Sequence, residues 1–340
     1  MKKTRIMILF GGKSGEHDIS LMSAASVMRA MDKDKYEITS VGITREGDWR
    51  EFVGNVAEID AIDWEGQSKP FDVNRLFQKN KEVDTVFPVL HGPFGEDGTV
   101  QGLLEMAGVS YVGAGVLASA VAMDKGIAKM LLDSEGIPQA KYQLINRKDF
   151  VEDNMRVISR IEDQFEYPVF IKPANLGSSV GISKAKNRDE LLISIEEAMK
   201  YDRRIIVETF INAREIECAV LGNENPKASL PAEVVPYHEF YDYNDKYFEG
   251  KSQLIVPANL PEDVVKEIQA LALQVYKIYD CKGLSRVDFF IEKETNNILV
   301  NEVNTMPGFT KISMYPKMWE ATGLPYRELI DQLINLSINK

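Results

Sequence analysis

The chain has 340 residues, of which 44% are hydrophobic and 27% charged, close to ordinary globular usage. At roughly 100–200 residues per domain, this length predicts two or three domains. The net charge of -12 argues against general binding to nucleic acid or anionic membranes, since both need a basic surface. It does not exclude a nucleotide ligand, which needs only a few lysines and a metal ion.

The cysteines and the lengths of the apolar runs indicate the cellular compartment. Cys218 and Cys281 stand in no pairing motif and are expected to be reduced, buried thiols. The first residues are basic, but the apolar run after them is short and stops at glycines, unlike a signal peptide. No run approaches the roughly 18 apolar residues of a membrane span. We therefore expect a cytoplasmic protein with no membrane partner.

The first predicted strand ends in ILFGGKSGEHDIS, residues 8–20, whose Gly-Lys-Ser triplet is typical of a phosphate-binding P-loop. That pattern requires a glycine five positions before Gly12, where the chain has Met7, and the dinucleotide pattern G-x-G-x-x-G fails on spacing. What remains is a glycine-bent strand-to-helix turn that carries Glu16 and His17. The helix after it is expected to bury one face, made of Ile19, Met22, Ser26 and Ala30.

The first 120 or so residues alternate strand and helix patterns, which predicts a parallel sheet. The strand candidates are RIMILF, YEITSVGIT, DTVFPVL and the short SYVG. Helices are expected after Gly15, across GTVQGLLEMAG with Gly108 as its C-cap, and across VLASAVAMDKGIAKMLLDSEG.

From about residue 126 the pattern changes. YPVFIKP and VGISKAK read as short strands around a glycine-serine loop at 174–181, and a helix is expected at 188–200. RIIVETFI and REIECAVLG are strand-like runs that suggest antiparallel pairing. Residues 237–252 are polar and aromatic without either period, which predicts a long surface loop of the kind that tends to be functional. A helix beginning near Pro261 follows.

The last predicted element is a hairpin, RVDFFIEKETNNILVNEVN, with its turn at ETNN. This turn places Asp288 opposite the stretch from Glu302 to Asn304, to within one residue, and the latter two share a face of their strand. Burying two like charges together is expensive, and a magnesium ion is the natural compensation because it takes oxygen ligands. The alternative is an ordinary hairpin with a charged, solvated face.

Four motifs, taken together, carry a resemblance to a known family. They are HGPFGEDGTVQG at 91–102, KPANLGSSVGIS at 172–183, RVDFF at 286–290 and NEVNTMPGFT at 301–310. Read together, they resemble the D-alanine–D-alanine ligase branch of the ATP-grasp superfamily, and the resemblance extends over nearly the whole chain.

The resemblance implies an ATP-grasp fold of class α/β, with an α+β C-terminal part, in which ATP lies between two antiparallel sheets. It implies three domains: a Rossmann-like domain at 1–122, a central ATP-grasp domain at 123–212 with the phosphate loop 174–181, and a C-terminal ATP-grasp domain at 213–340 with the omega loop 237–252 and the metal site.

For ATP, the resemblance matches Lys125 and Lys172 to lysines that contact the phosphates, and GSSVG, which contains Ser179, to the loop that closes over them. The remaining ATP matches are Glu208, Phe210 and Ile211 at the adenine and Glu215 at the ribose. A lone lysine can also be a solvated surface charge, and the two apolar residues can also be core.

For the amino-acid substrates, the resemblance places Glu16 opposite the amino group of the first D-alanine, with Ser178 and Tyr247 as its hydrogen-bonded partners. His91 matches a histidine near the same pocket. The alternatives are that Glu16 only complements the dipole of the helix after it and that His91 is structural. The other matches are Lys246 beside Tyr247, and Ser313 with Met314 at the carboxylate of the second substrate.

The implied reaction has two steps: an acylphosphate forms from D-alanine and ATP, and the amine of a second D-alanine then displaces phosphate. Arg286 and the Gly308 N–H match the groups that stabilise the transferred phosphoryl group and the oxyanion. Asp288, Glu302 and Asn304 would hold two Mg2+ or Mn2+ ions over the phosphates. Closure of the two loops would keep water from the acylphosphate.

The expected product is D-alanyl-D-alanine for peptidoglycan precursor synthesis, because Tyr247 favours an amine nucleophile in this family. A sister ligase that forms D-alanyl-D-serine or D-alanyl-D-lactate is the alternative. A non-catalytic nucleotide-binding relative would be expected to lose the metal ligands or the phosphate loop, and a dehydrogenase would need the dinucleotide glycines. The partners implied are D-alanine, ATP and, by analogy with the family, a second copy of the chain in a homodimer.

Overall fold

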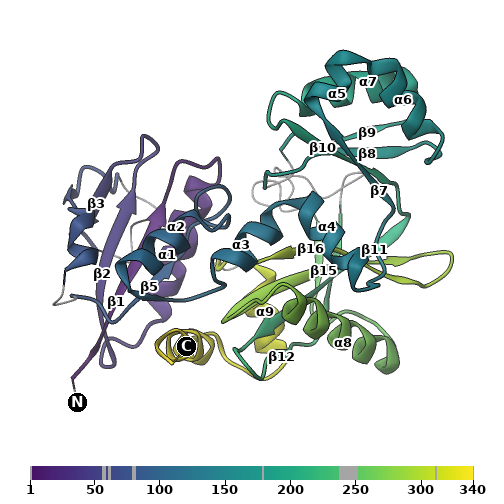
Figure 1. The fold of residues 1–340 in the computed structure, drawn as a ribbon. Coiled ribbons are helices and arrows are strands. Elements are labelled where there is room, and N and C mark those ends of the chain that lie inside the picture. The colour runs from purple at the N-terminus through teal and green to yellow at the C-terminus, as the bar shows by residue number, and fades with distance from the viewer. Residues whose placement is uncertain are drawn as a thin grey trace.

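The computed structural model describes residues 2–55, 59, 63–78, 82–177, 180–236, 252–310 and 312–339, and Figure 1 shows their arrangement around three sheets. Four predicted site residues lie outside the described residues: Ser178, Ser179, Lys246 and Tyr247. The loop predicted at 237–252 lies outside them too, apart from Ser252. Among the described helices, none is long and apolar enough to cross a membrane.

The N-terminal sheet has the strand order β4-β3-β2-β1-β5-β6. Its four parallel strands are the predicted ones: β1 (Thr4–Gly11), β2 (Tyr36–Ile43), β5 (Thr85–Pro88) and β6 (Ser110–Tyr111). The edge strands β3 (Trp49–Phe52) and β4 (Ser68–Pro70) are antiparallel and were not predicted. β1 is buried from Ile6 onward, as expected of a central strand covered on both faces.

The helices of this part are α1 (His17–Ala30), α2 (Thr99–Ala107) and the 3-10 helix η2 (Val73–Phe77). α2 ends as predicted at Gly108, which is left-handed with φ 61°. The face predicted for α1 is wrong at Met22, whose side chain is 41% exposed. α1 packs on β1 and also against the C-terminal helix, so it buries a broader face that includes Ser20 and Ser23. Small polar residues such as these are invisible to a search for apolar periodicity.

The second sheet is antiparallel, with the order β7-β10-β8-β9. Its strands are β7 (Tyr142–Asn146), β8 (Val169–Pro173), β9 (Ser183–Ala185) and β10 (Arg204–Thr209). Helices α5 (Arg147–Glu152), α6 (Asn154–Glu162) and α7 (Arg188–Ala198) pack over it around a core of its own (Figure 1). The helix predicted at 188–200 is thus confirmed.

The third sheet has the order β14-β13-β11-β15-β16, with β12 paired to β11. Its strands are β11 (Ala213–Leu221), β12 (Lys227–Ala228), β13 (Ala232–Val235), β14 (Gln253–Ile255), β15 (Leu284–Glu292) and β16 (Ile298–Asn304). The pairing suggested between RIIVETFI and REIECAVLG is wrong, because β10 and β11 belong to different sheets. Only residues 210–212 separate them, so the chain passes between the sheets there.

The remaining helices are α3 (Val116–Met123), α4 (Lys125–Ser134), α8 (Glu262–Ile278), α9 (Met314–Ala321) and α10 (Tyr326–Ile338). The single helix predicted over residues 116–136 is wrong, because it is broken at Asp124. Asp124 is extended, with φ -89° and ψ 95°, and its side chain accepts a hydrogen bond from Ile127 N to cap α4. Its carboxylate also pairs with Arg204 of β10, so a tertiary contact favours the break.

One hydrophobic core joins the N-terminal sheet to α9, α10 and part of the third sheet. Phe87 of β5 and Phe309, just before α9, meet edge to face with ring centroids 5.6 Å apart. Among the residues that the structure describes, those of the second sheet belong to a separate core. The first and third sheets therefore form one packed body, and the second stands beside it with its own core.

Candidate active site

A cavity of about 590 Å³ is lined by residues of the second and third sheets and by loops that follow β1 and β5 of the first, and its size is typical of small-molecule sites. Every predicted site residue that the structure describes lines this cavity: Glu16, His91, Lys125, Lys172, Glu208, Phe210, Ile211, Glu215, Arg286, Asp288, Glu302, Asn304, Gly308, Ser313 and Met314. Side chains separated by up to about 300 positions in sequence thus meet in one space.

The hairpin of β15 and β16 supplies the carboxylates at one wall. Asp288 lies directly opposite Glu302, and Arg286 opposite Asn304, so the predicted register is confirmed. The register shifts just after Asp288, where one extra residue, Asn301, forms a β-bulge. The bulge was not predicted, but the buried positions of β16 (Ile298, Val300 and Val303) indicate it, since their spacing changes from two to three.

Arg286 holds Asp288 in a two-pronged contact. Its Nε and Nη2 donate to the two carboxylate oxygens at 2.7 and 2.6 Å, and Nε also lies 3.3 Å from Glu217 Oε2. Burial alone lowers the pKa of Arg286, but Asp288 and Glu217 reverse this and raise the pKa above its usual value. The guanidinium therefore stays charged inside the cavity, where an anionic group can be bound.

The donor set of this wall suits magnesium. Asp288 and Glu302 offer carboxylate oxygens, and Asn304 offers an amide oxygen on the same face. Among the described residues, no group of three or more His, Cys, Asp or Glu side chains is placed to hold a metal ion. Two carboxylates and an amide fit Mg2+, which usually keeps several waters and takes its other ligands from substrate phosphates.

Lysines from two other elements form the opposite wall. Lys172 of β8 and Glu208 of β10 are diagonal neighbours in the ladder, and Lys172 Nζ lies 2.5 Å from Glu208 Oε2. Lys129 Nζ lies 2.9 Å from Glu208 Oε1. Burial alone raises the pKa of Glu208, but the two lysines outweigh it and lower the pKa to about 2. Lys125, one turn before Lys129, donates to Leu176 O at 2.6 Å, at the start of the glycine-serine loop.

Sequence reasoning missed Lys129. The signal was available, because Lys125 and Lys129 are four residues apart and so lie on one face of α4.

Phe210 and Ile211 are half-buried cavity residues, not core. The Lys184 ammonium lies 4.0 Å from the centroid of the Phe210 ring, and Phe170 lies beside that ring. The two rings are tilted by 38° to each other, so this part of the cavity is lined by partly exposed aromatic side chains.

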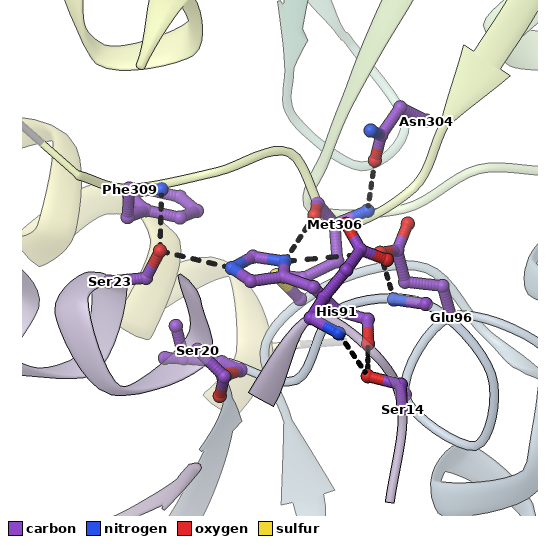
Figure 2. Close-up of polar contacts among 12 residues, drawn as sticks. Ser14, Ser20, Ser23, His91, Glu96, Asn304, Met306 and Phe309 are labelled. Carbon is purple, nitrogen blue, oxygen red and sulfur yellow. Dashed lines mark hydrogen bonds and ion pairs between the residues drawn. The ribbon is translucent and has the colours of Figure 1, made fainter. Parts of the chain in front are cut away.

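The β1–α1 turn supplies the acidic group on the third side. Glu16 is the N-cap residue of α1 and is only 8% exposed. Ser14 Oγ accepts from Glu16 N at 3.2 Å and donates to His91 O at 2.7 Å, which ties the turn to the β5–α2 loop (Figure 2). Gly92 is left-handed with φ 73°, and a Cβ there would lie 2.5 Å from Glu16 Oε2. The left-handed backbone favours glycine at this position, and a larger residue would displace the Glu16 carboxylate from its place in the cavity.

His91 lies near Glu16, and both nitrogens of its ring make hydrogen bonds within the protein. Nδ1 lies 3.1 Å from Met306 O, and Nε2 lies 3.0 Å from Ser23 Oγ (Figure 2). Burial lowers the pKa of His91, although the charge of Glu16 and the Met306 carbonyl oppose this. Neutral imidazole is therefore favoured.

Glu96 was not predicted, although it lies in the quoted motif HGPFGEDGTVQG. Its Oε1 accepts from Gly92 N at 2.7 Å and lies 3.9 Å from His91 Nδ1 (Figure 2). Burial and the charge of Glu16 raise the pKa of Glu96 well above its usual value, despite the opposing effects of Gly92 N–H and Arg286. The cavity thus contains a buried carboxyl group whose pKa is shifted toward that of a proton donor.

The segment after β16 closes the cavity. Gly308 lines it and is half-buried, and an added Cβ there would lie 2.7 Å from Ser313 Oγ. Ser313 Oγ accepts from Thr310 N at 2.9 Å, and Ser313 is also the N-cap residue of α9. A helix N-terminus favours an anion, so this end of the cavity is suited to a carboxylate.

Comparison with known proteins identifies the family of the chain. The family model described as D-ala D-ala ligase N-terminus matches residues 5–114, and the one described as D-ala D-ala ligase C-terminus matches residues 131–335. A Caldicellulosiruptor bescii protein named D-alanine–D-alanine ligase is 51% identical over 352 residues, covering 100% of this chain and 96% of that protein. A protein of the same name from Clostridium acetobutylicum is 51% identical, covering 99% of each.

Two solved structures show the same fold. The VanG D-Ala:D-Ser ligase from Enterococcus faecalis superimposes with a TM-score of 0.89 at 38% identity, covering 99% of this chain and 100% of that one. The D-alanine-D-alanine ligase from Coxiella burnetii superimposes with a TM-score of 0.88 at 39% identity, covering 100% of this chain and 95% of that one. The ATP-grasp fold expected from the motifs is therefore confirmed.

Proposed function

The chain belongs to the D-alanine–D-alanine ligase family, and we propose that its cavity joins two D-alanine molecules into D-alanyl-D-alanine while ATP is cleaved to ADP and phosphate. The product is a precursor of peptidoglycan. The observation that carries this conclusion is the convergence, in one cavity, of two lysines, an arginine, two cross-strand carboxylates and a separate acidic turn. That combination can hold a triphosphate at one end and a small zwitterion at the other.

In the first step, a carboxylate oxygen of the first D-alanine attacks the γ-phosphorus of ATP. The bond between that phosphorus and the β–γ bridging oxygen breaks, ADP leaves, and D-alanyl phosphate forms. Lys125 and Lys172 offset the charge of the phosphates, and Arg286 stabilises the phosphoryl group in transfer. Glu16 binds the ammonium group of the substrate and so orients its carboxylate.

Asp288, Glu302 and Asn304 are the residues that would hold the metal, as two Mg2+ or Mn2+ ions. When bound, the ions offset the negative charge that develops on the phosphates. The two carboxylates lie opposite one another, and Arg286 keeps Asp288 in place from the side.

In the second step, the amine of the second D-alanine attacks the carbonyl carbon of the acylphosphate. A tetrahedral oxyanion forms and then collapses, phosphate leaves, and one proton leaves the nitrogen. Arg286 and the Gly308 N–H stabilise the oxyanion, and Ser313, with Met314 beside it at the start of α9, binds the carboxylate of the second substrate.

The other assignments rest on the resemblance. Glu208, Phe210 and Ile211 would receive adenine, with Glu215 at the ribose. Ser178 and Ser179 would belong to the loop that closes on the phosphates, and Lys246 and Tyr247 to the loop that covers the amino-acid substrates. We further propose the three-domain division at about residues 122 and 212, and a homodimer, which light scattering after size-exclusion chromatography would test.

The function is tested by ADP release with Mg2+ and D-alanine, with the product identified by mass spectrometry. D-Serine and D-lactate are then added in turn, because one structural neighbour is a D-Ala:D-Ser ligase. We expect D-alanyl-D-alanine as the main product of every mixture. No D-alanine-dependent ADP release would contradict the ligase function, and a predominant D-alanyl-D-serine product would contradict the substrate assignment alone.

A further inference from the structure

The segment from residue 305 to 310 connects β16 to the turn before α9, and its backbone is held at several points. Met306 N donates to Asn304 Oδ1 at 3.1 Å. Phe309 O accepts from Tyr326 OH at 3.1 Å, and Thr310 N donates to Ser313 Oγ at 2.9 Å. Three backbone polar groups of this short segment are thus bonded within the protein.

Two further bonds link the segment to the N-terminal part of the chain through a single relay, drawn in Figure 2. His91 Nδ1 lies 3.1 Å from Met306 O, His91 Nε2 lies 3.0 Å from Ser23 Oγ, and Phe309 N donates to Ser23 Oγ at 3.2 Å. The relay therefore begins and ends on the same segment, at positions 306 and 309.

The proton positions of this relay follow from its end groups. A carbonyl oxygen can only accept, so His91 Nδ1 carries the proton that binds Met306 O. Nε2 of the neutral ring then accepts from the Ser23 hydroxyl, whose oxygen in turn accepts from Phe309 N–H. Each of the three donors in the relay, His91 Nδ1–H, Ser23 O–H and Phe309 N–H, then has one acceptor. This pattern requires a neutral imidazole that carries its proton on Nδ1.

Gly308 lies between the two clamped residues, and its N–H differs from its neighbours. Within the described part of the chain this N–H has no hydrogen-bond partner, although Gly308 lines the cavity and is half-buried. The Phe309 side chain is fully buried against Phe87 and Tyr315, which restricts the segment further. The Gly308 N–H is therefore available to the cavity, in a segment whose backbone is anchored at Met306, Phe309 and Thr310.

We propose that Ser23 and His91 form a clamp that positions the Gly308 N–H for the developing oxyanion. This inference rests on the proposed function, and it makes His91 a positioning residue, not a substrate contact. Both ring nitrogens are bonded to the protein and the ring is 4% exposed, while Ser23 is fully buried. An oxyanion donor acts only when its distance to the oxyanion is right, so loosening its backbone lowers the rate of the chemical step.

The kinetic test compares Ser23→Ala, His91→Gln and the double variant. Each single change should lower kcat by about 10- to 100-fold, the range expected when a catalytic donor is misplaced by about 1 Å. KM for ATP should stay at the wild-type value, because the clamp touches no ATP residue. The double variant should lose little more than one single variant, because both changes break the same relay.

Ser229→Ala is the matched control. Ser229 is equally buried, and its hydroxyl accepts from Ala219 N at 3.0 Å and donates to Leu230 O at 2.9 Å, next to β12 of the third sheet. Its hydrogen bonds in the described part of the chain do not involve residues 305–310. It should retain the wild-type kcat even if it lowers stability. A wild-type kcat in Ser23→Ala, or fully additive losses in the double variant, would overturn the clamp.

Two measurements without substrate decide the clamp independently of the ligase activity. Hydrogen exchange of the Phe309 amide should quicken in Ser23→Ala but not in Ser229→Ala. Nitrogen NMR of the histidine rings should find His91 neutral with its proton on Nδ1; a proton on Nε2, or unchanged exchange at Phe309, would overturn the proposal. Absence of D-alanine-dependent ADP release by the wild-type protein would instead contradict the proposed function.

Discussion

Asp288 and Glu302 lie directly opposite each other across the β15–β16 ladder, and the β-bulge begins immediately after this pair. The bulge lets β16 direct Val300 and Val303 into the core while Glu302 and Asn304 stay at the cavity. Two carboxylates on one face, with Asp288 buried and Glu302 half-buried, need compensation, and Arg286 supplies only one positive charge to Asp288. The pair is therefore the place where metal binding can be tested most directly.

Asp288→Asn should lower the rate of D-alanine-dependent ADP release by more than about 100-fold. Changing a residue that only supports a metal ligand typically costs about 10- to 100-fold, and Asp288 is proposed to be a ligand itself. The amide keeps the shape of the side chain but loses the charge that holds a divalent ion. The rate should be measured over a range of Mg2+ concentrations, and Mn2+ binding in the presence of ADP gives a readout besides activity. Asp331→Asn, a partly buried carboxylate of α10 that pairs with Lys35, is the control. A wild-type rate and unchanged Mn2+ binding in Asp288→Asn would falsify the metal role.

Arg286→Lys should lower kcat by about 10²- to 10³-fold, the usual effect of removing one oxyanion donor. Lysine keeps the charge but cannot make the two-pronged contact with Asp288, so both the donor geometry and the carboxylate position are lost. Arg214→Lys is the matched control, because Arg214 contacts Glu233 through two bonds of 2.7 and 2.7 Å in the same sheet, away from the cavity lining. Equal losses in both variants would show that the effect is structural.

Glu208→Gln should lower the free energy of unfolding by about 3–5 kcal/mol, because it leaves two buried lysines without their shared counterion. Urea unfolding at neutral pH measures this change. Glu262→Gln removes an exposed partner of Lys266 and should cost about 0.5 kcal/mol at most. A loss in Glu208→Gln as small as in this control would mean that the carboxylate is not the counterion of the two lysines in solution.

His91 should make stability depend on pH. Its pKa is lowered below the ordinary value of 6.5, so between the lowered value and 6.5 the unfolded chain binds more protons than the folded one. The stabilising contribution is therefore complete above pH 6.5 and is lost as the pH falls through the folded-state pKa. Unfolding midpoints of wild type and His91→Gln from about pH 5 to about pH 8 test this. Their difference should shrink toward acid pH, and a constant difference would contradict it.

Tyr247→Phe should increase the use of D-lactate relative to D-alanine, a prediction that rests on the family resemblance because this residue lies outside the described part of the chain. The resemblance implies that D-alanine-specific enzymes have a Lys-Tyr pair here, and that some relatives that form the D-lactate ester have phenylalanine at the tyrosine position. Product ratios at neutral pH, with both nucleophiles present, are the measurement. An unchanged ratio would count against the assignment of DYNDKY as the specificity segment.

Local features were predictable because their physical causes are local. The hairpin register follows from the position of its turn, the C-cap at Gly108 follows from the backbone freedom of glycine, and the parallel strands follow from apolar runs between helices. The sequence therefore determined, by itself, the family, many but not all of the cavity residues in the four motifs, and most of the helices and strands.

The tertiary structure decided what depends on partners distant in sequence. The break at Asp124 is favoured by Arg204, and Lys129 pairs with the cavity residue Glu208 only because β10 lies against α4. The role of Ser23 could not be predicted, because a single serine in a helix does not indicate which distant group it will bind. Its partner Phe309 N lies 286 positions away along the chain. Hydrogen bonds act over about 3 Å in space and not along the chain, so only the folded molecule determines which polar groups meet.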